Sequence, residues 1–132
     1  SCVSVCLYDA KNNVSGMNHH MLPTVPPSSK ARDDQEGKYG ETALPELLRR
    51  MRQRGMNPGS TTAKIFGGAK MLSQLSFGLI SERNVTVARD ILRQHGIRIV
   101  AEDVGGERGR KILFKTDSGK VLVKEVAKRE FL

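Results

Sequence analysis

The residues best suited to chemistry lie at the start of the chain, where both cysteines and two of the three histidines occur within the first twenty residues. Cys2 and Cys6 lie in an apolar run that predicts a strand over residues 1–9, and the two adjacent histidines lie in a second run over 14–23. A thiol beside an imidazole is the pair that nucleophilic catalysis requires, because the imidazole can take the thiol proton. The two runs therefore predict an enzyme whose nucleophile and base come from neighbouring strands.

A turn signal separates the two runs. Asn12 and Asn13 stand between them, and asparagine accepts the positive φ angles of tight hairpin turns. Paired strands lie about 5 Å apart, so a hairpin would bring a thiol close to an imidazole. Because side chains alternate between the faces of a strand, His19 and His20 point to opposite faces, and at most one can meet Cys2. The spacing leaves both histidines open, and no acidic residue is placed to orient either imidazole.

The two cysteines are expected to remain free thiols. Cys2 and Cys6 are separated by four positions of one strand, which at about 3.3 Å per residue places their Cα atoms about 13 Å apart. A disulfide requires Cα atoms within about 7 Å, and one zinc ion cannot take both thiolates unless the strand bends. Free thiols are typical of a reducing compartment, so we expect a cytoplasmic protein.

The rest of the pattern predicts an α/β fold. After the first hairpin, the predicted elements are a helix over 41–54, a strand over 63–66, a helix that starts at Ser81–Asn84 and ends at His95, a strand over 97–101, and a second hairpin with strands over 111–116 and 120–126. Their order, β-β-α-β-α-β-β-β, predicts a layered α/β sandwich with mixed or antiparallel strands and two main helices. With 132 residues, the chain is expected to form a single domain over 1–132.

Composition limits the classes of function. The net charge of +8 favours an anionic partner, although lysine and arginine that merely coat a soluble surface give the same charge. No apolar run reaches the length of a membrane span, about 18 residues. Tryptophan is absent and aromatic residues make up 5% of the chain, so no platform for stacking nucleic-acid bases is expected.

Three further segments bear on the site. Gly67-Gly68 follows a predicted strand but lacks the P-loop pattern, so we expect a tight turn at which backbone segments approach closely. The segment from Pro23 to Tyr39 has no apolar period and predicts a long loop, either a solvated connection or a lid beside the first hairpin. The chain starts inside a strand-like run without an initiator methionine, so we expect its N-terminus to be incomplete.

Several segments resemble one known protein family, in the same order and over nearly the whole chain. They are residues 1–9, 16–23, 64–69, 82–84 and 102–111, of which Ser-Cys-Val at 1–3 and Gly-Met-Asn-His-His-Met-Leu-Pro at 16–23 are the most specific. The pattern is similar to that of the chemoreceptor glutamine deamidases, the CheD family. The resemblance implies that Cys2 is the nucleophile and that His19 is the general base and acid. It also implies a catalytic threonine slightly upstream of the cysteine, in a segment that would precede residue 1.

The resemblance implies an activity and its partners. The activity is hydrolytic deamidation of specific glutamine side chains to glutamate through a cysteine thioester, with no metal or organic cofactor. The substrate would be the cytoplasmic domain of methyl-accepting chemoreceptors and the partner a CheC-type chemotaxis phosphatase, in the cytoplasm, with neither nucleic-acid binding nor membrane insertion. The glutamines selected, hydrolysis of glutamate methyl esters, the phosphatase docking surface and the oligomeric state stay open.

The alternative from another functional class is a basic, non-catalytic adaptor or binding module, which would regulate a chemotaxis phosphatase or contact nucleic acid. Arg108, Arg110 and Lys111 could contact phosphates in such a module. The missing aromatic platform and the lack of a known nucleic-acid motif disfavour nucleic acid. The presence of Cys2 and His19 favours the enzyme.

Overall fold

The computed structural model describes residues 1–27, 37–70 and 78–126 of the chain. The order of its strands and helices agrees with the prediction, and the fold is a layered α/β arrangement with mixed strand pairing. No helix of these described segments is long and apolar enough to span a membrane. The elements are β1 (Val3–Asp9), β2 (Val14–His20), α1 (Gly40–Gln53), a short 3-10 helix (Pro58–Ser60), β3 (Thr61–Gly67), α2 (Gly78–Gln94), β4 (Arg98–Val104), β5 (Arg110–Phe114) and β6 (Val121–Glu125).

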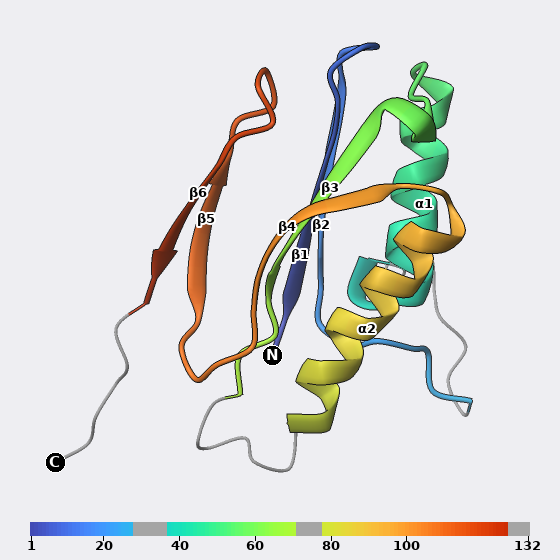
Figure 1. Cartoon of the computed structure of the whole chain (residues 1–132). Coiled ribbons are helices and arrows are strands. Elements are labelled where there is room, and N and C mark those ends of the chain that lie inside the picture. The colour runs from blue at the N-terminus through green and yellow to red at the C-terminus, as the bar shows by residue number, and fades with distance from the viewer. Residues whose placement is uncertain (28–36, 71–77, 127–132) are drawn as a thin grey trace, which may run out of the picture.

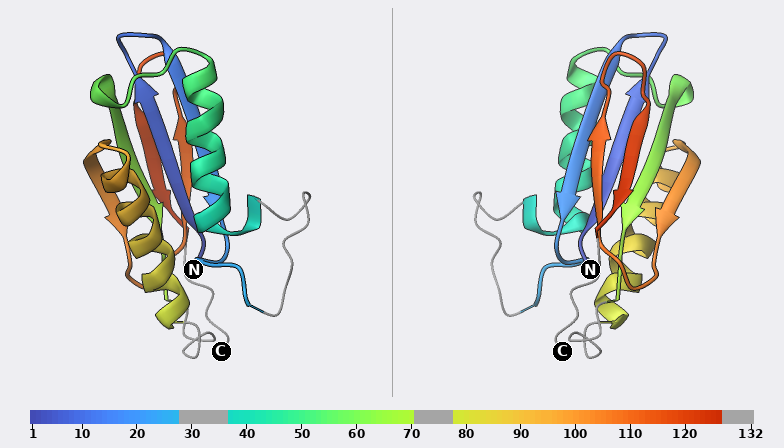
Figure 2. Two further views of the ribbon diagram at one scale, coloured as in Figure 1. Left: turned by 90° about the vertical axis from the view of Figure 1, so that its right-hand side faces the viewer. Right: turned by 90° about the vertical axis from the view of Figure 1, so that its left-hand side faces the viewer.

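Four strands form the central sheet, in the order β2-β1-β3-β4. β1 pairs antiparallel with β2 and with β3, and β3 pairs parallel with β4, so β1 and β3 are the inner strands. The β1–β2 hairpin has the predicted turn, in which Asn13 adopts a positive φ of 55°. Figures 1 and 2 show three layers: α1 and α2 cover one face of the sheet, and the β5–β6 hairpin covers the other.

The face of the sheet under the helices carries the apolar core. Along β1, Val3, Val5 and Leu7 are fully buried and alternate with Ser4 and Cys6, because successive side chains of a strand point to opposite faces. The three apolar residues belong to one cluster with side chains from the helices and β3, among them Leu44, Leu48, Met51, Ala63, Ile65, Val85, Ala88 and Leu92. β1 is therefore divided into an apolar side, which faces the helices, and a side with small polar residues.

The tip of the β5–β6 hairpin is bonded to the other face of the sheet. The hydroxyls of Tyr8 and Ser15 donate to the carbonyl oxygens of Asp117 at 3.0 Å and Thr116 at 2.6 Å. Gly119 has a φ of +76°, and a Cβ on it would lie 2.5 Å from the Tyr8 ring, so the close approach of the tip to the sheet requires glycine there. With its tip fixed, the hairpin covers the side of the sheet that faces away from the helices.

The structure corrects the predicted start of the second helix. α2 begins at Gly78, so Ser81 and Asn84 lie inside the helix and not at its N-terminal cap. Ser and Asn are good caps because their side chains bond free backbone groups, but here both side chains bond the backbone of other segments. The Ser81 hydroxyl donates to the carbonyl oxygen of Ala69 at 3.0 Å. Positions 28–36 of the predicted long loop lie outside the described residues.

Candidate active site

Cys2 stands immediately before β1, where a glycine pair fixes its backbone. The Cys2 carbonyl oxygen accepts a hydrogen bond from the N–H of Gly68 at 2.9 Å. Gly67 has a φ of +111°, and a Cβ on it would lie 2.3 Å from that same carbonyl oxygen. A side chain at Gly67 would displace Cys2, because both the backbone angle and the available space exclude it. The close backbone approach predicted at this glycine pair is confirmed, and the segment approached is Cys2.

Asn84 of α2 ties together the two strand ends that carry the cysteine and the histidines. Its side chain is fully buried, and Nδ2 donates to the carbonyl oxygens of Ser1 at 3.0 Å and Met21 at 2.9 Å. Its own backbone carbonyl lies 3.0 Å from Nε2 of His20, which must donate because a carbonyl oxygen only accepts. One helical residue therefore positions the start of β1 and the end of β2.

The strand register separates the two histidines. His20 pairs with Val3 and turns to the helices, where its ring is fully buried. Burial lowers the pKa of His20, and the neighbouring His19 lowers it further, against the opposing effect of the hydrogen bond to the Asn84 carbonyl. His19 pairs with Ser4 and turns to the opposite face, which is the face of Cys2. The residue pattern left either histidine open, and the structure places His19 with the thiol.

Ser4 supplies a hydrogen-bonding partner for His19. Its Oγ lies 3.1 Å from Nδ1 of the imidazole. With Nδ1 engaged, Nε2 is the ring nitrogen left for a thiol or a substrate. The sequence analysis missed this residue, although a signal was present. Once Asp9 pairs with Val14 across the predicted turn, the antiparallel register places Ser4 opposite His19.

A cavity of about 410 Å³ lies between the sheet and the start of β5. Its volume falls within the range of about 300–1,000 Å³ that is typical of small-molecule sites, so it can admit a single extended side chain. Both predicted site residues, Cys2 and His19, reach it. Its other lining residues are Ser1, Ser4, Met17, Phe66, Gly67, Ala69, Gly109, Arg110 and Ile112.

Arg110 brings a fixed positive charge to the wall of this cavity. Its side chain is only 7% exposed, and it donates from Nη1 to the Gly67 carbonyl at 3.1 Å and from Nε to Asp103 Oδ1 at 3.2 Å. The alternative function grouped Arg110 with Arg108 and Lys111 as phosphate contacts. Arg110 instead turns inward and supports the glycine turn, so the three residues do not form one surface patch for phosphate.

Cys6 is a structural thiol. It lies two positions along β1 beyond Ser4, is 2% exposed and forms no disulfide. Burial raises the pKa of Cys6 to about 11, although the positive charge of Lys64 opposes the shift. At neutral pH Cys6 therefore remains protonated, and the half-buried Cys2 is the thiol that faces the cavity.

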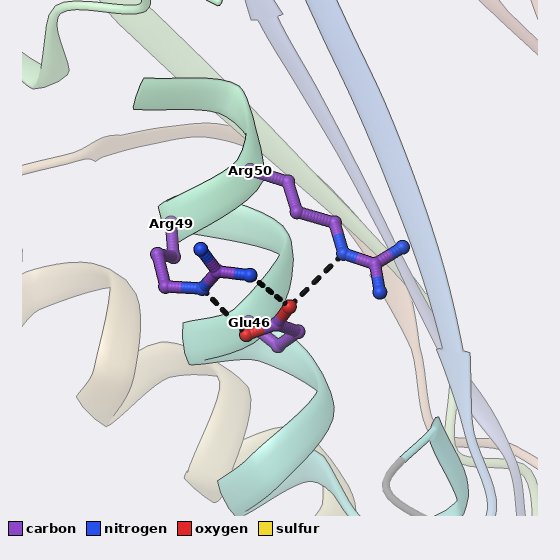
Figure 3. Close-up of polar contacts among 3 residues, drawn as sticks. All are labelled: Glu46, Arg49 and Arg50. Atoms are coloured by element: carbon purple, nitrogen blue, oxygen red, sulfur yellow. Dashed lines mark hydrogen bonds and ion pairs between the residues drawn. The ribbon is translucent and has the colours of Figure 1, made fainter. Parts of the chain in front are cut away.

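A second hollow, of about 340 Å³, lies between β2 and α1. Met17 and His19 line both this hollow and the active-site cavity. The α1 wall carries Glu46 and Arg50, and Figure 3 shows Arg49 and Arg50 converging on the Glu46 carboxylate. Hydrogen bonds from Arg49 at 2.6 and 2.8 Å and from Arg50 at 3.0 Å lower the pKa of Glu46 to about 2, so the carboxylate stays ionised. His19 thus stands between two openings in the surface.

The chain is similar to proteins of one known family. A model of the family described as CheD chemotactic sensory transduction matches residues 21–125. The probable chemoreceptor glutamine deamidase CheD of Sulfurimonas denitrificans is 42% identical over 133 residues, which cover 99% of this chain and 83% of that protein. The protein of the same name from Laribacter hongkongensis is 42% identical over 126 residues, which cover 96% of this chain and 61% of that protein.

The match with a third relative covers the whole chain, including the residues of the site. The chemoreceptor glutamine deamidase CheD of Thermotoga maritima is 37% identical over 132 residues, which cover 100% of this chain and 81% of that protein. This match includes Cys2 and His19, which precede the segment that the family model covers.

Proposed function

The chain belongs to the CheD family, and on this premise we propose that it hydrolyses side-chain amides of glutamines in chemoreceptors, with Cys2 as nucleophile and His19 as general base and acid. The observation that carries the proposal is the meeting of Cys2, Ser4 and His19 at one cavity, with the Ser4 hydroxyl on Nδ1 of the imidazole. The names of the relatives supply the substrate, a chemoreceptor glutamine.

In the first step, a glutamine side chain enters the cavity and the sulfur of Cys2 attacks its amide carbon. His19 takes the thiol proton through Nε2 while Ser4 holds Nδ1. A C–S bond forms, and the electron pair of the C=O double bond moves onto the oxygen. Backbone N–H groups beside Cys2 would stabilise this oxyanion, and the Gly67-Gly68 turn keeps that backbone in place.

In the second step, the tetrahedral intermediate returns its electron pair to the carbonyl and expels nitrogen. His19 gives its proton to the leaving nitrogen, so the C–N bond breaks with release of ammonia, and a thioester links Cys2 to the substrate. Neutral His19 then deprotonates a water molecule that attacks the thioester. The C–S bond breaks, Cys2 recovers its proton, and glutamate remains. Each turnover consumes one water molecule and releases one molecule of ammonia.

Membership of the family also bears on where the enzyme acts and which protein it binds. We place its action in the cytoplasm, on the cytoplasmic domain of the receptor, with a CheC-type phosphatase as binding partner. Size-exclusion chromatography of the mixed proteins tests this partner: a joint peak supports the complex, and separate peaks at micromolar concentration contradict it.

The activity is tested by incubating the protein with a chemoreceptor cytoplasmic domain and following the mass gain of amide-to-acid conversion on individual glutamine peptides. We expect Cys2→Ala and His19→Gln to abolish the conversion. Matched controls come from the same chain: Cys6→Ala removes the buried thiol, and His95→Gln removes a histidine at the far end of α2. Both controls should retain activity. Full conversion by Cys2→Ala would reject the mechanism.

The adaptor alternative predicts a different outcome of the same experiment. A non-catalytic module would convert no glutamine even as the parent protein, while it would still bind the phosphatase. Absence of conversion together with a stable phosphatase complex would therefore favour the adaptor.

A further inference from the structure

The outer face of the β5–β6 hairpin combines lysines with exposed leucines. In β5, Arg110 and Ile112 turn inward to the active-site cavity, so the alternate positions point away from the sheet. Figure 1 shows that this hairpin is the outermost layer of the molecule, and Figure 2 shows its outward face. We call the outward set the lysine–leucine face; its residues are Lys111, Leu113, Lys115, Lys120, Leu122 and Lys124.

The strand register arranges this face as three cross-strand pairs. Leu113 lies opposite Leu122, and the two side chains are 60% and 62% exposed. Lys111 lies opposite Lys124 on one side of the leucine pair. On the other side the chain turns back at Lys115, whose N–H donates to the carbonyl of its opposite residue, Lys120, at 2.8 Å. An apolar centre is therefore flanked at both ends by pairs of positive charges.

This arrangement weakens the isolated hairpin. Like charges directly opposite each other on paired strands repel, at a cost of up to about 1 kcal/mol for each pair. None of the four lysine ammonium groups has a hydrogen-bond or ion-pair partner among the residues that the structure describes. The tip of the hairpin is held to the sheet by bonds on its inner side, and the outer lysines and leucines take no part in those bonds.

The charges and the apolar pair of the lysine–leucine face indicate which kind of partner it can bind. Four ammonium groups that have no partner in the described part of the chain favour carboxylates or other anions, and the leucine pair between them favours an apolar side chain. A second copy of the chain would set lysines against lysines, which its net charge of +8 also disfavours. Lys111 and Lys115 are four residues apart on a strand, about 13 Å. Carboxylates two turns apart on a helix, about 11 Å, come close to that separation and leave an apolar residue between them.

We propose that the lysine–leucine face binds an acidic, amphipathic helical segment of the substrate receptor, with an apolar side chain of that segment against Leu113 and Leu122. The inference rests on the proposed deamidase function and adds to it the surface that recruits the substrate. Because β5 presents Ile112 to the active-site cavity and Leu113 to the partner, the β5–β6 hairpin lies between the bound segment and the cavity that Cys2 lines. The face contributes to the capture of the receptor, and the chemistry remains with Cys2 and His19.

The test compares a charge reversal on this face with one on the opposite side of the molecule. Lys111→Glu/Lys124→Glu keeps a like-charged pair at that position, so the stability of the hairpin should not change. Arg52→Glu/Arg54→Glu makes the same change in net charge at the exposed end of α1, on the other side of the sheet. Both are assayed with a chemoreceptor cytoplasmic domain and with a short glutamine peptide from the same receptor, which cannot reach the outer face of the hairpin.

We expect Lys111→Glu/Lys124→Glu to raise KM for the receptor domain about tenfold and to leave kcat and the peptide rate within about twofold of the parent. Leu113→Asn should raise the same KM, and the arginine control should not. Equal KM values for the parent and the lysine variant would overturn the docking surface while leaving the deamidase function intact. Equal increases in the lysine and arginine variants would also overturn it, because only net charge would then matter.

Two further measurements test the docking surface independently of catalysis and distinguish the receptor from an anionic lipid as its partner. Binding of the receptor domain to Cys2→Ala protein, with and without Lys111→Glu/Lys124→Glu, reports docking even if the parent proves inactive. Binding that requires the lysines supports the surface, and binding that ignores them rejects it. Flotation with phosphatidylserine vesicles covers the lipid alternative. Lysine-dependent vesicle binding with unchanged receptor binding would reassign the face to a membrane surface.

Discussion

The hydroxyl oxygen of Ser4 lies 3.1 Å from Nδ1 of His19, on the face of the sheet that also carries Cys2. The contact joins residues opposite each other on β1 and β2, so the hairpin itself orients the imidazole. No acidic side chain is required for that orientation.

Removal of the Ser4 hydroxyl should slow catalysis without unfolding the protein. One hydrogen bond contributes about 1 kcal/mol, so Ser4→Ala should lower kcat about fivefold with little change in KM. Ser4→Thr keeps a hydroxyl on a strand-forming residue and should restore most of the rate. A kcat–pH profile of both variants checks the assignment. If Ser4→Ala and Ser4→Thr lose activity equally while both stay folded, packing and not the hydrogen bond is responsible.

A methyl group at Gly67 should disable the enzyme. Its Cβ would lie 2.3 Å from the Cys2 carbonyl oxygen, whereas a Cβ on Gly55, which has a similar φ of +96°, would meet nothing within 4 Å. Both Gly→Ala changes should cost about 1–2 kcal/mol of unfolding free energy through backbone strain. Only Gly67→Ala should also lose deamidation. Denaturant unfolding and activity assays measure the two effects, and equal activity in both variants would contradict the contact with Cys2.

Alkylation should distinguish the two cysteines. Because burial raises the pKa of Cys6 to about 11, its thiol remains protonated and enclosed at neutral pH. Iodoacetamide at about pH 8 should label Cys2 and leave Cys6 unmodified until denaturant is added. Peptide mass spectrometry gives the rate at each site. Comparable labelling of both thiols in the folded protein would show that Cys6 is not enclosed.

His20 should make the folded protein sensitive to mild acid. Its pKa is lowered in the folded state, so the unfolded chain binds more protons at this residue as the pH falls below the ordinary histidine value of about 6.5. Its contribution to stability is full above that value and is lost as the pH falls towards the lowered pKa. Melting temperatures between about pH 7.5 and 5 should therefore fall in the parent. His20→Gln should flatten this slope and His95→Gln should not; equal slopes in all three proteins would reject the role of His20.

Asp9 should make stability depend on pH in a lower range than His20 does. Its fully buried carboxylate accepts hydrogen bonds from Asn12, from the backbone N–H of Asn57 and from the Ser60 hydroxyl. Burial disfavours ionisation, but these bonds outweigh it and lower the pKa of Asp9 to about 2. The stability that Asp9 provides is complete above about pH 4 and disappears as the pH falls through about 2.

The variant Asp9→Asn distinguishes the effect of Asp9 on stability from the effects of other carboxylates. Asp9→Asn should cost about 1–3 kcal/mol at neutral pH, because buried donors lose an ionised acceptor. It should also reduce the acid dependence of unfolding below about pH 4. Asp90→Asn, on the exposed side of α2, is the control and should change neither quantity. An acid transition in Asp9→Asn identical to that of the parent would assign the effect to other groups.

The sequence by itself determined the elements and the chemistry available to them. Alternation predicted both hairpins, and local turn preference placed the first turn at Asn13, which adopts a positive φ. Strand spacing was enough to exclude a disulfide between Cys2 and Cys6. These properties depend on neighbouring residues of the chain, so a linear pattern can reveal them. The resemblance to a known family added the choice of His19.

Only the tertiary structure decided which residues meet. Both faces of β1 are buried, so alternation could not say which face the helices would cover, and therefore which histidine would join Cys2. Ser81 and Asn84 have the side chains of helix caps, yet they bond distant backbone because α2 packs across the ends of β1 and β2. Arg110 belongs to a basic run but turns inward, because Asp103 and the Gly67 carbonyl lie there. Each outcome depends on contacts between segments far apart in the chain, which local pattern does not encode.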